Sequence, residues 1–395
     1  LFGDKNVGAA KAVAVSGYAI SGADAGNYAL VQPTGVTADI TALSLAVTGA
    51  TAANKTYDAL LGAVISGGVI APISGDSVTL ATAGRAGVFA DKNVGSSKAV
   101  AVSGYAISGA DAGNYSLVQP TGVTANITAL NLAVSGATAA NKTYDALLGA
   151  VISGGAITPL SGDAVTLVTS GRTGVFASKN VGTSKAVTVS GYTISGTDAA
   201  NYSLVQPTGV TANITALNLA VTGATAANKT YDALLGATIS GGSIAPIAGD
   251  VVTLDISGRA GLFGDKNVGT SKGVTVSGYT ISGTDAGNYS LVQPTGVTAN
   301  ITALNLAVTG ATAANKTYDA LLGATISGGV IAPIVGDVVS LDASGRSGLF
   351  GDKNVGAAKA VAVSGYAISG ADAGNYALVQ PTGVTADITA LSLAV

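Results

Sequence analysis

The sequence predicts an all-β protein made of tandem repeats, and its composition and its periodicity carry that prediction. Among 395 residues there are 56 Gly, no Cys, no His, no Met, no Trp and no Glu. Val, Thr, Ser, Ala and Gly dominate, which favours strands and turns over helices. A constant step of 87 residues also separates equivalent positions. The series are Tyr57, Tyr144, Tyr231 and Tyr318; Arg85, Arg172, Arg259 and Arg346; and Phe2, Phe89, Phe176, Phe263 and Phe350.

This period predicts a tandem array of about 87-residue units. About seven short strands per unit, with turns every 8–12 residues, are typical of an immunoglobulin-like β-sandwich. A β-grasp-like unit stays open as the alternative. The expected divisions are a partial repeat (the C-terminal part) at 1–42, repeats at 43–129, 130–216, 217–303 and 304–390, and the start of the next repeat at 391–395.

The junctions between units contain no linker. The segment 127–136, ITALNLAVSG, runs from the last strand of one unit into the first strand of the next. Without Pro or a Gly-Ser run to loosen it, we expect neighbouring units to keep a fixed relation and to form a rod. Each unit would add on the order of 30 Å. Residues 1–47 are identical to 349–395 and no Met occurs, so we expect the chain to be an excerpt from a longer array.

The first half of the unit at 43–129 is expected to hold four strands. The segments 43–51 and 56–67 read as the first two. Polar and apolar residues alternate over 77–80, which is typical of a half-buried strand. The segment 86–91 brings Phe89, the single Phe of the unit, to the core.

The segment 98–108, KAVAVSGYAIS, is the most regular strand pattern in the unit. Its apolar residues change phase half-way, and a bulge at Ser103-Gly104 would return them to one face. We therefore predict that Val100, Val102, Tyr105 and Ile107 are buried.

The end of the unit is predicted to be a β-hairpin. Its strands would be 114–118 and 122–128, joined across the turn sequence QPTG. In the loop before it, Asp111 and Asn114 are placed for side-chain bonds to the nearby backbone.

Several of these segments together resemble a known repeat family. They are Lys55-x-Tyr57-Asp58, Gly75-Asp76 before a strand, FADKNVGSSKAVAVSG, ISGADAGNYSL and a closing TANIT. This pattern is similar to the YDG-type repeats of large filamentous-haemagglutinin-like adhesins of Gram-negative bacteria, many of them exported by two-partner secretion. The family usually has Gly where this chain has Ala59, which suggests that the turn does not need a positive φ.

The resemblance implies an extracellular location, at a bacterial cell surface, and a structural role. We expect stalk or spacer repeats of a large adhesin, which project a binding region or build a cell–cell or biofilm fibre. The resemblance supplies no catalytic residue, and the chain has no His, Cys or Glu for acid–base or nucleophilic chemistry. We therefore predict no enzyme activity, no cofactor, and no catalytic, cofactor-binding or metal residue.

Partners are constrained by charge and hydropathy. The net charge is −3 and the cations are spread along the chain, so no basic patch for nucleic acid is expected. No segment reads as a membrane-inserting helix. Calcium has a weak candidate in Asp111 and Asn114, a pair without further oxygen ligands, and in the third occurrence of the DKN motif Ser178 replaces Asp91.

Two other functions stay open from the sequence. A multivalent array could bind host or bacterial surface glycans or proteins, with Tyr57, Tyr105 and Tyr115 as stacking platforms, although their positions favour burial. Alternatively, exposed strand edges could pair between copies of the chain and form an extracellular filament. The sequons at Asn54, Asn114 and Asn126 are candidate glycosylation sites, with turn formation as the simpler interpretation.

The segment NKTYDALLGA at 54–63 returns unchanged three times. We interpret it as a signature of the fold and not as a ligand site. Asn54 and Lys55 are expected to turn the chain, Tyr57 to anchor the next strand, and Asp58 to bond locally.

Overall fold

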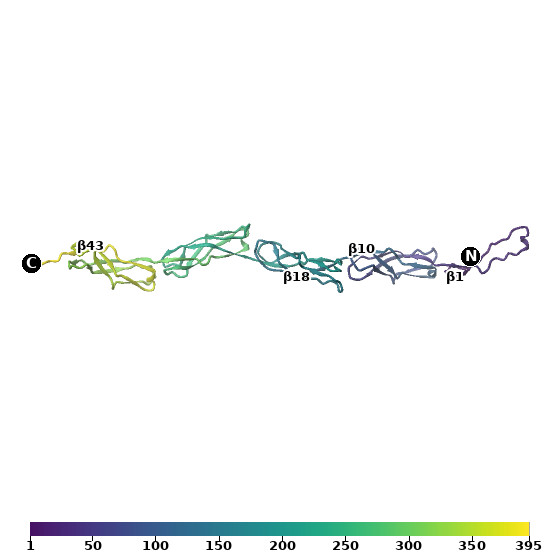
Figure 1. Ribbon diagram of the computed structural model, residues 1–395, viewed down its shortest axis with the longest axis horizontal. Coiled ribbons are helices and arrows are strands. Elements are labelled where there is room, and N and C mark those ends of the chain that lie inside the picture. Colours follow the sequence, from purple (N-terminus) through teal and green to yellow (C-terminus); the bar gives the residue numbers. More distant parts are fainter. Residues whose placement is uncertain (395) are drawn as a thin grey trace. The chain divides into compact units, whose positions relative to one another are not determined.

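The computed structural model of the chain describes residues 1–394, which form strands, turns and short 3-10 helices and no α-helix. The strand pattern returns every 87 residues, with β3, β14, β25 and β36 beginning at Leu43, Leu130, Leu217 and Leu304. We call β3–β13, β14–β24, β25–β35 and β36–β46 the first to fourth full copies, and β1–β2 the partial copy. The prediction of an all-β, repetitive chain is confirmed (Figure 1).

The first full copy has eleven strands and one 3-10 helix where about seven strands were predicted. They are β3 (Leu43–Ala46), β4 (Thr48–Ala52), β5 (Lys55–Thr56), β6 (Gly62–Ala63), β7 (Ile65–Val69), β8 (Thr79–Ala81), β9 (Ala86–Phe89), β10 (Gly95–Ser103), β11 (Ala106–Ser108), η2 (Ala112–Asn114), β12 (Tyr115–Val118) and β13 (Thr124–Thr128).

The other copies repeat this order. The partial copy has β1 (Gly8–Ala12), η1 (Ala25–Asn27) and β2 (Thr37–Ile40). The second has β14 (Leu130–Ala133), β15 (Ser135–Ala139), β16 (Lys142–Thr143), β17 (Gly149–Ala150), β18 (Ile152–Ala156), β19 (Thr166–Val168), β20 (Thr173–Phe176), β21 (Gly182–Ser190), β22 (Thr193–Ser195), η3 (Ala199–Asn201), β23 (Tyr202–Val205) and β24 (Thr211–Thr215). The third has β25 (Leu217–Ala220), β26 (Thr222–Ala226), β27 (Lys229–Thr230), β28 (Gly236–Ala237), β29 (Ile239–Ser243), β30 (Thr253–Asp255), β31 (Ala260–Phe263), β32 (Gly269–Ser277), β33 (Thr280–Ser282), η4 (Ala286–Asn288), β34 (Tyr289–Val292) and β35 (Thr298–Thr302). The fourth has β36 (Leu304–Ala307), β37 (Thr309–Ala313), β38 (Lys316–Thr317), β39 (Gly323–Ala324), β40 (Ile326–Val330), β41 (Ser340–Asp342), β42 (Ser347–Phe350), β43 (Gly356–Ser364), β44 (Ala367–Ser369), η5 (Ala373–Asn375), β45 (Tyr376–Val379) and β46 (Thr385–Thr389).

The internal contacts divide the chain into two compact units. Unit 1 comprises Leu1–Ala140, Gly149–Ala177 and Ser184–Ala212. Unit 2 comprises Asn141–Leu148, Ser178–Thr183 and 213–394.

A five-stranded sheet, in the order β5-β13-β10-β9-β6, forms the centre of the first copy. The long strand β10 pairs antiparallel with β13 along its first half and with β9 along its second half. Two pairs of strands are parallel, β3 with β12 and β5 with β13, so the beginning of the copy lies against its end. The antiparallel pairs β4–β7 and β8–β11 complete it.

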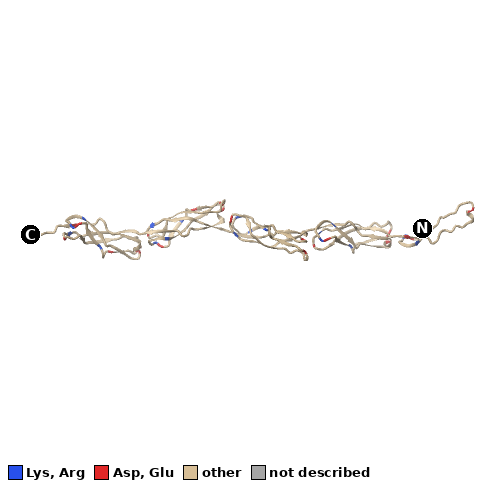
Figure 2. Ribbon diagram, viewed as in Figure 1, with Lys and Arg blue, Asp and Glu red and all other residues tan. Residues whose placement is uncertain are grey.

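The core of the first copy is aromatic and aliphatic. Tyr57, Phe89 and Ile127 are almost completely buried, and Phe89 is in the core as predicted. Figure 2 shows that charged residues are few along the strands and lie mainly near the ends of a copy. Among residues 1–394, no helix is long and apolar enough to cross a membrane.

The segment 98–108 is two strands and not one bulged strand. β10 ends at Ser103 and pairs with β9, whereas β11 begins at Ala106 and pairs with β8. Between them Gly104 has a φ of +80°, and a Cβ there would lie 2.0 Å from the Gly84 carbonyl oxygen, so only glycine fits. Three of the predicted core residues, Val100, Val102 and Tyr105, are buried, and the fourth, Ile107, is half-buried.

The predicted strand at 56–67 is interrupted. β5 ends at Thr56, the chain turns through residues 57–61, and β6 and β7 follow. The Asp58 carboxylate accepts a hydrogen bond from the Leu60 amide at 2.9 Å, which stabilises the turn against an extended strand.

The predicted terminal hairpin is wrong, because β12 and β13 do not pair with each other. β12 pairs with β3, and β13 pairs with β10 and β5. Gln119, which was expected in the turn of the hairpin, instead binds the Tyr105 backbone: its side-chain oxygen accepts from the Tyr105 N–H at 3.1 Å and its side-chain nitrogen donates to the Tyr105 carbonyl at 2.8 Å. A side chain thus occupies the place that a strand partner would take.

Candidate functional site

The connection between the first and second copies is short and is closed by Tyr57. A single residue, Ala129, separates β13 from β14. The Tyr57 N–H donates to the carbonyl of Thr128, the last residue of β13, at 2.8 Å. From this anchored position its side chain reaches the second copy, where its hydroxyl donates to the Asp163 carboxylate at 2.8 Å.

Asp163 is the centre of this junction. Its carboxylate also accepts hydrogen bonds from the Tyr202 hydroxyl at 2.7 Å and from the Lys92 ammonium at 2.7 Å. The Asp163 side chain is 1% exposed, and Lys92 makes a second ion pair with Asp198 at 3.0 Å. A buried carboxylate of this kind is tolerated because a cation and two hydroxyl donors satisfy it.

Apolar packing connects the same two copies. The rings of Tyr57 and Tyr202 meet edge to face, with centroids 5.6 Å apart and planes at 74°. The Lys92 ammonium lies 5.8 Å from the centre of the Tyr57 ring. Tyr202 and Leu132, both from the second copy, belong to the buried core of the first. The two copies therefore share one continuous core across the junction.

A buried asparagine adds a backbone contact. Asn201 accepts a hydrogen bond from the Val94 N–H at 2.9 Å, and its amide donates to the Asn93 side chain at 3.1 Å. The side chain is one of the few buried polar groups among residues 1–394. We call the set Tyr57, Lys92, Asp163, Asp198, Asn201 and Tyr202 the joint.

The ionisation of the joint follows from its burial and its pairing. Burial of the Asp163 carboxyl acts to raise its pKa, but the Lys92 ammonium and the hydroxyls of Tyr202 and Tyr57 outweigh burial and hold that pKa below its usual range. Burial, followed by the Asp163 carboxylate, raises the pKa of the Tyr57 hydroxyl. The hydrogen bonds to Asp163 and Asp198 raise the pKa of Lys92. At neutral pH the joint therefore contains an ionised pair, Lys92 and Asp163, and the Asp163 carboxylate also accepts from two neutral tyrosine hydroxyls.

The same joint occurs twice more, and both further joints lie within unit 2. One consists of Tyr144, Lys179, Asp250, Asp285, Asn288 and Tyr289. The other consists of Tyr231, Lys266, Asp337, Asp372, Asn375 and Tyr376. In both, the central aspartate side chain is 1% exposed, as Asp163 is.

Short-range bonds shape the loop that presents Tyr57. The Lys55 ammonium donates to the Asp58 carboxylate at 2.7 Å and to the Leu60 carbonyl at 2.6 Å. Asn54 accepts from the Asn126 N–H at 2.7 Å, which ties the loop to β13. The expected local roles of Lys55 and Asp58 are confirmed, whereas Asn54 bonds a residue 72 positions away and not its own turn.

Comparison with known sequences assigns these repeats. The YDG domain matches residues 1–36, 41–123, 128–210, 215–297 and 302–384. The chain belongs to the YDG domain family. No curated protein matches it. Among solved structures it is similar to the Bacillus anthracis TIE protein at 9% identity, over 87% of this chain and 75% of that chain, with a TM-score of 0.18, a likeness too slight to support any argument.

The alanine in the YDG signature corrects one expectation. The turn at Ala59 was expected to need no positive φ, but Ala59, Ala146 and Ala233 each have a φ of 63° and Ala320 has one of 70°. The turn requires this value because Asp58 and Lys55 both bind Leu60 and reverse the chain there. Each alanine therefore stores backbone strain that glycine would not.

The other candidate residues in the YDG repeats serve the fold. Asp111 was expected to bond the nearby backbone, but it accepts from the Ser77 N–H at 2.8 Å, 34 residues away. Asn114 likewise accepts from the Val7 N–H of the partial copy at 2.8 Å. Among residues 1–394 no cluster of three or more metal-ligating side chains occurs.

Sequence reasoning identified Tyr57 and Asp58 but missed Lys92, Asp163 and Asn201 as parts of one site. Lys92 lies in the first full repeat and Asp163 and Asn201 in the second, and the separations between them and from Tyr57 range from 35 to 144 positions. A signal existed, since charged residues make up only 10% of the chain and each full repeat contributes one Lys and one Asp in the DKN and Gly-Asp motifs.

Two of the sequon asparagines, Asn54 and Asn126, bond the backbone, and the equivalents of Asn114 are buried in the joints.

Proposed function

We propose that the chain is a structural stalk, in which YDG repeats follow one another as the shaft of a large extracellular adhesin. The observation that supports it is the recurrence of one buried joint, with the same Tyr, Lys, Asp and Asn, at three successive junctions. Ligand sites are generally exposed, whereas these groups are buried between copies and satisfied by one another.

The joint suits a mechanical task because bending it would break several contacts together. Separation of the two copies would expose the Tyr57 ring and leave the Asp163 carboxylate without its cation. A buried ion pair that loses one partner costs about 3–5 kcal/mol. With one residue between β13 and β14, the chain also has little slack. We therefore propose that the repeats form a stiff rod.

We propose the extracellular setting from the resemblance of these repeats to a family of bacterial adhesins. The repeats resemble those of filamentous-haemagglutinin-like adhesins, which are exported to the bacterial surface and carry ligand-binding regions elsewhere in the protein. In that setting the array would project a binding region or build a cell–cell or biofilm fibre, without catalysis. The unit itself we propose to be sandwich-like, with β-grasp-like packing as the alternative, because its strand pairs mix parallel and antiparallel pairing.

Solution scattering tests the stalk proposal. Chains with two, three and four full repeats should differ in maximum dimension by one constant increment of about 30 Å per repeat. A compact cluster of repeats would instead grow roughly as the cube root of the mass, and that result would contradict the stalk.

Glycan binding by the repeats is the weaker candidate. Tyr57, Tyr105 and Tyr115, the three aromatic platforms of the first copy, are all buried, and their hydroxyls bind Asp163, the Gly67 carbonyl and Asp76. Buried rings present no face on which a sugar could stack. Glycan-array binding by the whole chain would reopen this function.

A further inference from the structure

The two strands that join the first copy to its neighbours are both held by parallel partners. The first strand, β3, pairs in parallel with β12 over its whole length, from Leu43 beside Tyr115 to Ala46 beside Val118. The last strand, β13, pairs in parallel with β5 and antiparallel with β10. Any pull along the chain must enter and leave the copy through β3 and β13, which we call the clamp strands.

Both clamp strands point from the preceding junction toward the following one. β3 and β12 begin at the preceding junction, since Asn114, directly before β12, accepts from the Val7 N–H of the partial copy at 2.8 Å. β13 ends at the following junction, where the Thr128 carbonyl accepts from the Tyr57 N–H and the Tyr57 hydroxyl reaches Asp163 of the second copy. All of these residues belong to unit 1. A pull on the chain therefore acts along the axes of β3 and β13, in opposite directions.

A pull along a strand axis loads the hydrogen bonds of that strand together. The bonds between β3 and β12, and the one that the Val47 N–H donates to the Val118 carbonyl at 3.0 Å, must all break before β3 can slide. A pull across the strands would instead break them one after another, and a single hydrogen bond contributes little by itself. Burial adds to the resistance, since the side chains of Leu45 and Val47 on and beside β3 and of Ile127 on β13 lie in the core.

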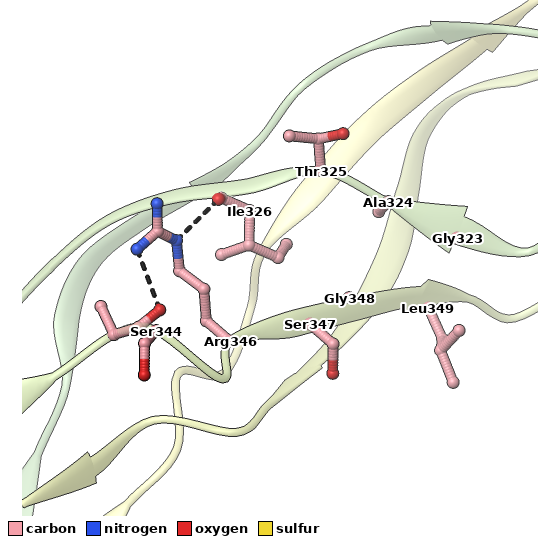
Figure 3. A pocket seen from close by; sticks show the side chains of 10 residues that line it. Gly323, Ala324, Thr325, Ile326, Ser344, Arg346, Ser347, Gly348 and Leu349 are labelled. Atoms are coloured by element: carbon pink, nitrogen blue, oxygen red, sulfur yellow. Dashed lines mark hydrogen bonds between the residues drawn. The ribbon is translucent and has the colours of Figure 1, made fainter.

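An arginine fixes the strands that follow β3 to the central sheet. Arg85, directly before β9, donates from Nε to the Ile65 carbonyl of β7 at 2.8 Å. In the fourth copy the equivalent Arg346 donates to the Ile326 carbonyl at 2.9 Å and to the Ala343 carbonyl at 3.0 Å (Figure 3). Because β7 is the partner of β4, and β4 directly follows β3, sliding of β3 would pull this pair with it. The arginine opposes that movement.

We propose that a full YDG copy is a mechanical clamp, which keeps its fold while the chain is under tension. The third and fourth copies have the same parallel pairs, β25 with β34 and β27 with β35, and β36 with β45 and β38 with β46. Stiffness against bending was assigned to the joint, whereas resistance to tension belongs to the inside of one copy. The clamp therefore goes beyond the stalk and does not depend on how the copies are arranged.

Optical tweezers can pull on the first copy of the whole chain in two geometries. The chain has no cysteine, so DNA handles at Ala42→Cys and Thr128→Cys load both clamp strands along their axes. Handles at Thr48→Cys and Thr128→Cys instead lift β3 from its far end, so that the hydrogen bond of Val47 is loaded first and alone. All three handle positions are exposed. Each unfolding event should lengthen the tethered chain by about 250–270 Å.

At one and the same force, the copy should unfold about tenfold more slowly when pulled from Ala42 than when pulled from Thr48. Both variants should show the same thermal unfolding without load, so that the direction of the pull and not stability sets the difference. Handles at Ala216, Thr222 and Thr302, the equivalent positions of the third copy, repeat the comparison if a substitution alters the first copy. Equal rates in the two geometries, or faster unfolding from Ala42, would overturn the proposal. The stalk is tested separately, by the maximum dimension in solution.

Discussion

Two junctions of this chain share one ion pair, and at one of them a tyrosine ring covers it. At the junction of the partial and first full copies, Lys5 pairs with Asp76 at 2.6 Å, and Tyr115 donates to Asp76 at 2.7 Å. These contacts match those of Lys92, Asp163 and Tyr202, and the position equivalent to Tyr57 would fall before Leu1, outside the given sequence. The Asp76 side chain is 11% exposed against 1% for Asp163, and Lys5 is 61% exposed against 35% for Lys92.

The comparison shows which contacts the two junctions have in common. The ion pair and the asparagine contact recur at both junctions, since Val7 donates to Asn114 just as Val94 donates to Asn201. A pocket of about 200 Å³, lined by Lys5, Asp76 and Tyr115 among others, lies at the first junction. At the junction of the first and second copies, the Tyr57 ring packs against Tyr202 and the Asp163 carboxylate is less exposed than that of Asp76.

Removal of the Tyr57 ring should expose the joint to solvent. Tyr57→Ala is expected to destabilise the joint by about 3–5 kcal/mol, because a large aromatic side chain leaves the shared core. Residues 157–167, whose sequence is unique in the chain, should lose hydrogen-exchange protection as measured by mass spectrometry. Tyr105→Ala, which removes a buried ring that bonds within the first copy, is the control and should leave 157–167 protected. Equal exposure of 157–167 in both variants would contradict the role of Tyr57.

The same lysine substitution should have unequal costs at the two junctions. Lys92→Met leaves the buried Asp163 carboxylate without a cation and should cost about 3 kcal/mol, whereas Lys5→Met beside the more exposed Asp76 should cost under about 1 kcal/mol. Hydrogen exchange over residues 157–167, which contain Asp163, measures the effect of Lys92→Met, and exchange over residues 70–80, which contain Asp76, measures that of Lys5→Met. Equal losses would show that burial by tyrosine does not strengthen the pair.

Alkaline pH should open a closed joint through its tyrosines. Burial, with the Asp337 carboxylate next, raises the pKa of Tyr376 to about 12, against an ordinary value of 10.0. Because the folded pKa is the higher one, the stabilisation is complete below pH 10 and is lost as pH rises from 10 toward 12. Ultraviolet absorbance of tyrosinate should therefore rise together with the loss of protection at 331–341. Ionisation of Tyr376 near pH 10 in the folded chain would contradict the closed state.

A small stabilisation should follow from relief of strain beside the joint. Ala59→Gly removes the cost of a positive φ and should stabilise the first copy by about 0.5–1 kcal/mol, less the burial lost with its methyl group. Ala63→Gly, four residues later in β6 with ordinary backbone angles, is the matched control and should destabilise by a similar amount. Thermal unfolding followed by circular dichroism measures both changes. A destabilising Ala59→Gly would show that the turn is not strained.

The sequence predicted the period, the all-β class and the buried faces, because these depend on residue type and local spacing. Val100, Val102 and Phe89 are in the core for that reason. It failed where a side chain replaces a strand partner, as Gln119 does against Tyr105, since such bonds leave no periodic trace. It also failed to assemble the joint, because Tyr57 and Asp163 are 106 positions apart and each looks like a turn or strand residue by itself.

The central claim, that the joint holds adjacent copies in one relation, can be tested by a distance measurement. The chain has no cysteine, so spin labels can be placed uniquely at Ala101→Cys and Thr188→Cys, two exposed and equivalent strand positions of the first and second copies. Double electron–electron resonance should give one narrow distance distribution in this chain and a broad one after Tyr57→Ala. A broad distribution with the joint intact, or a narrow one without Tyr57, would contradict the account.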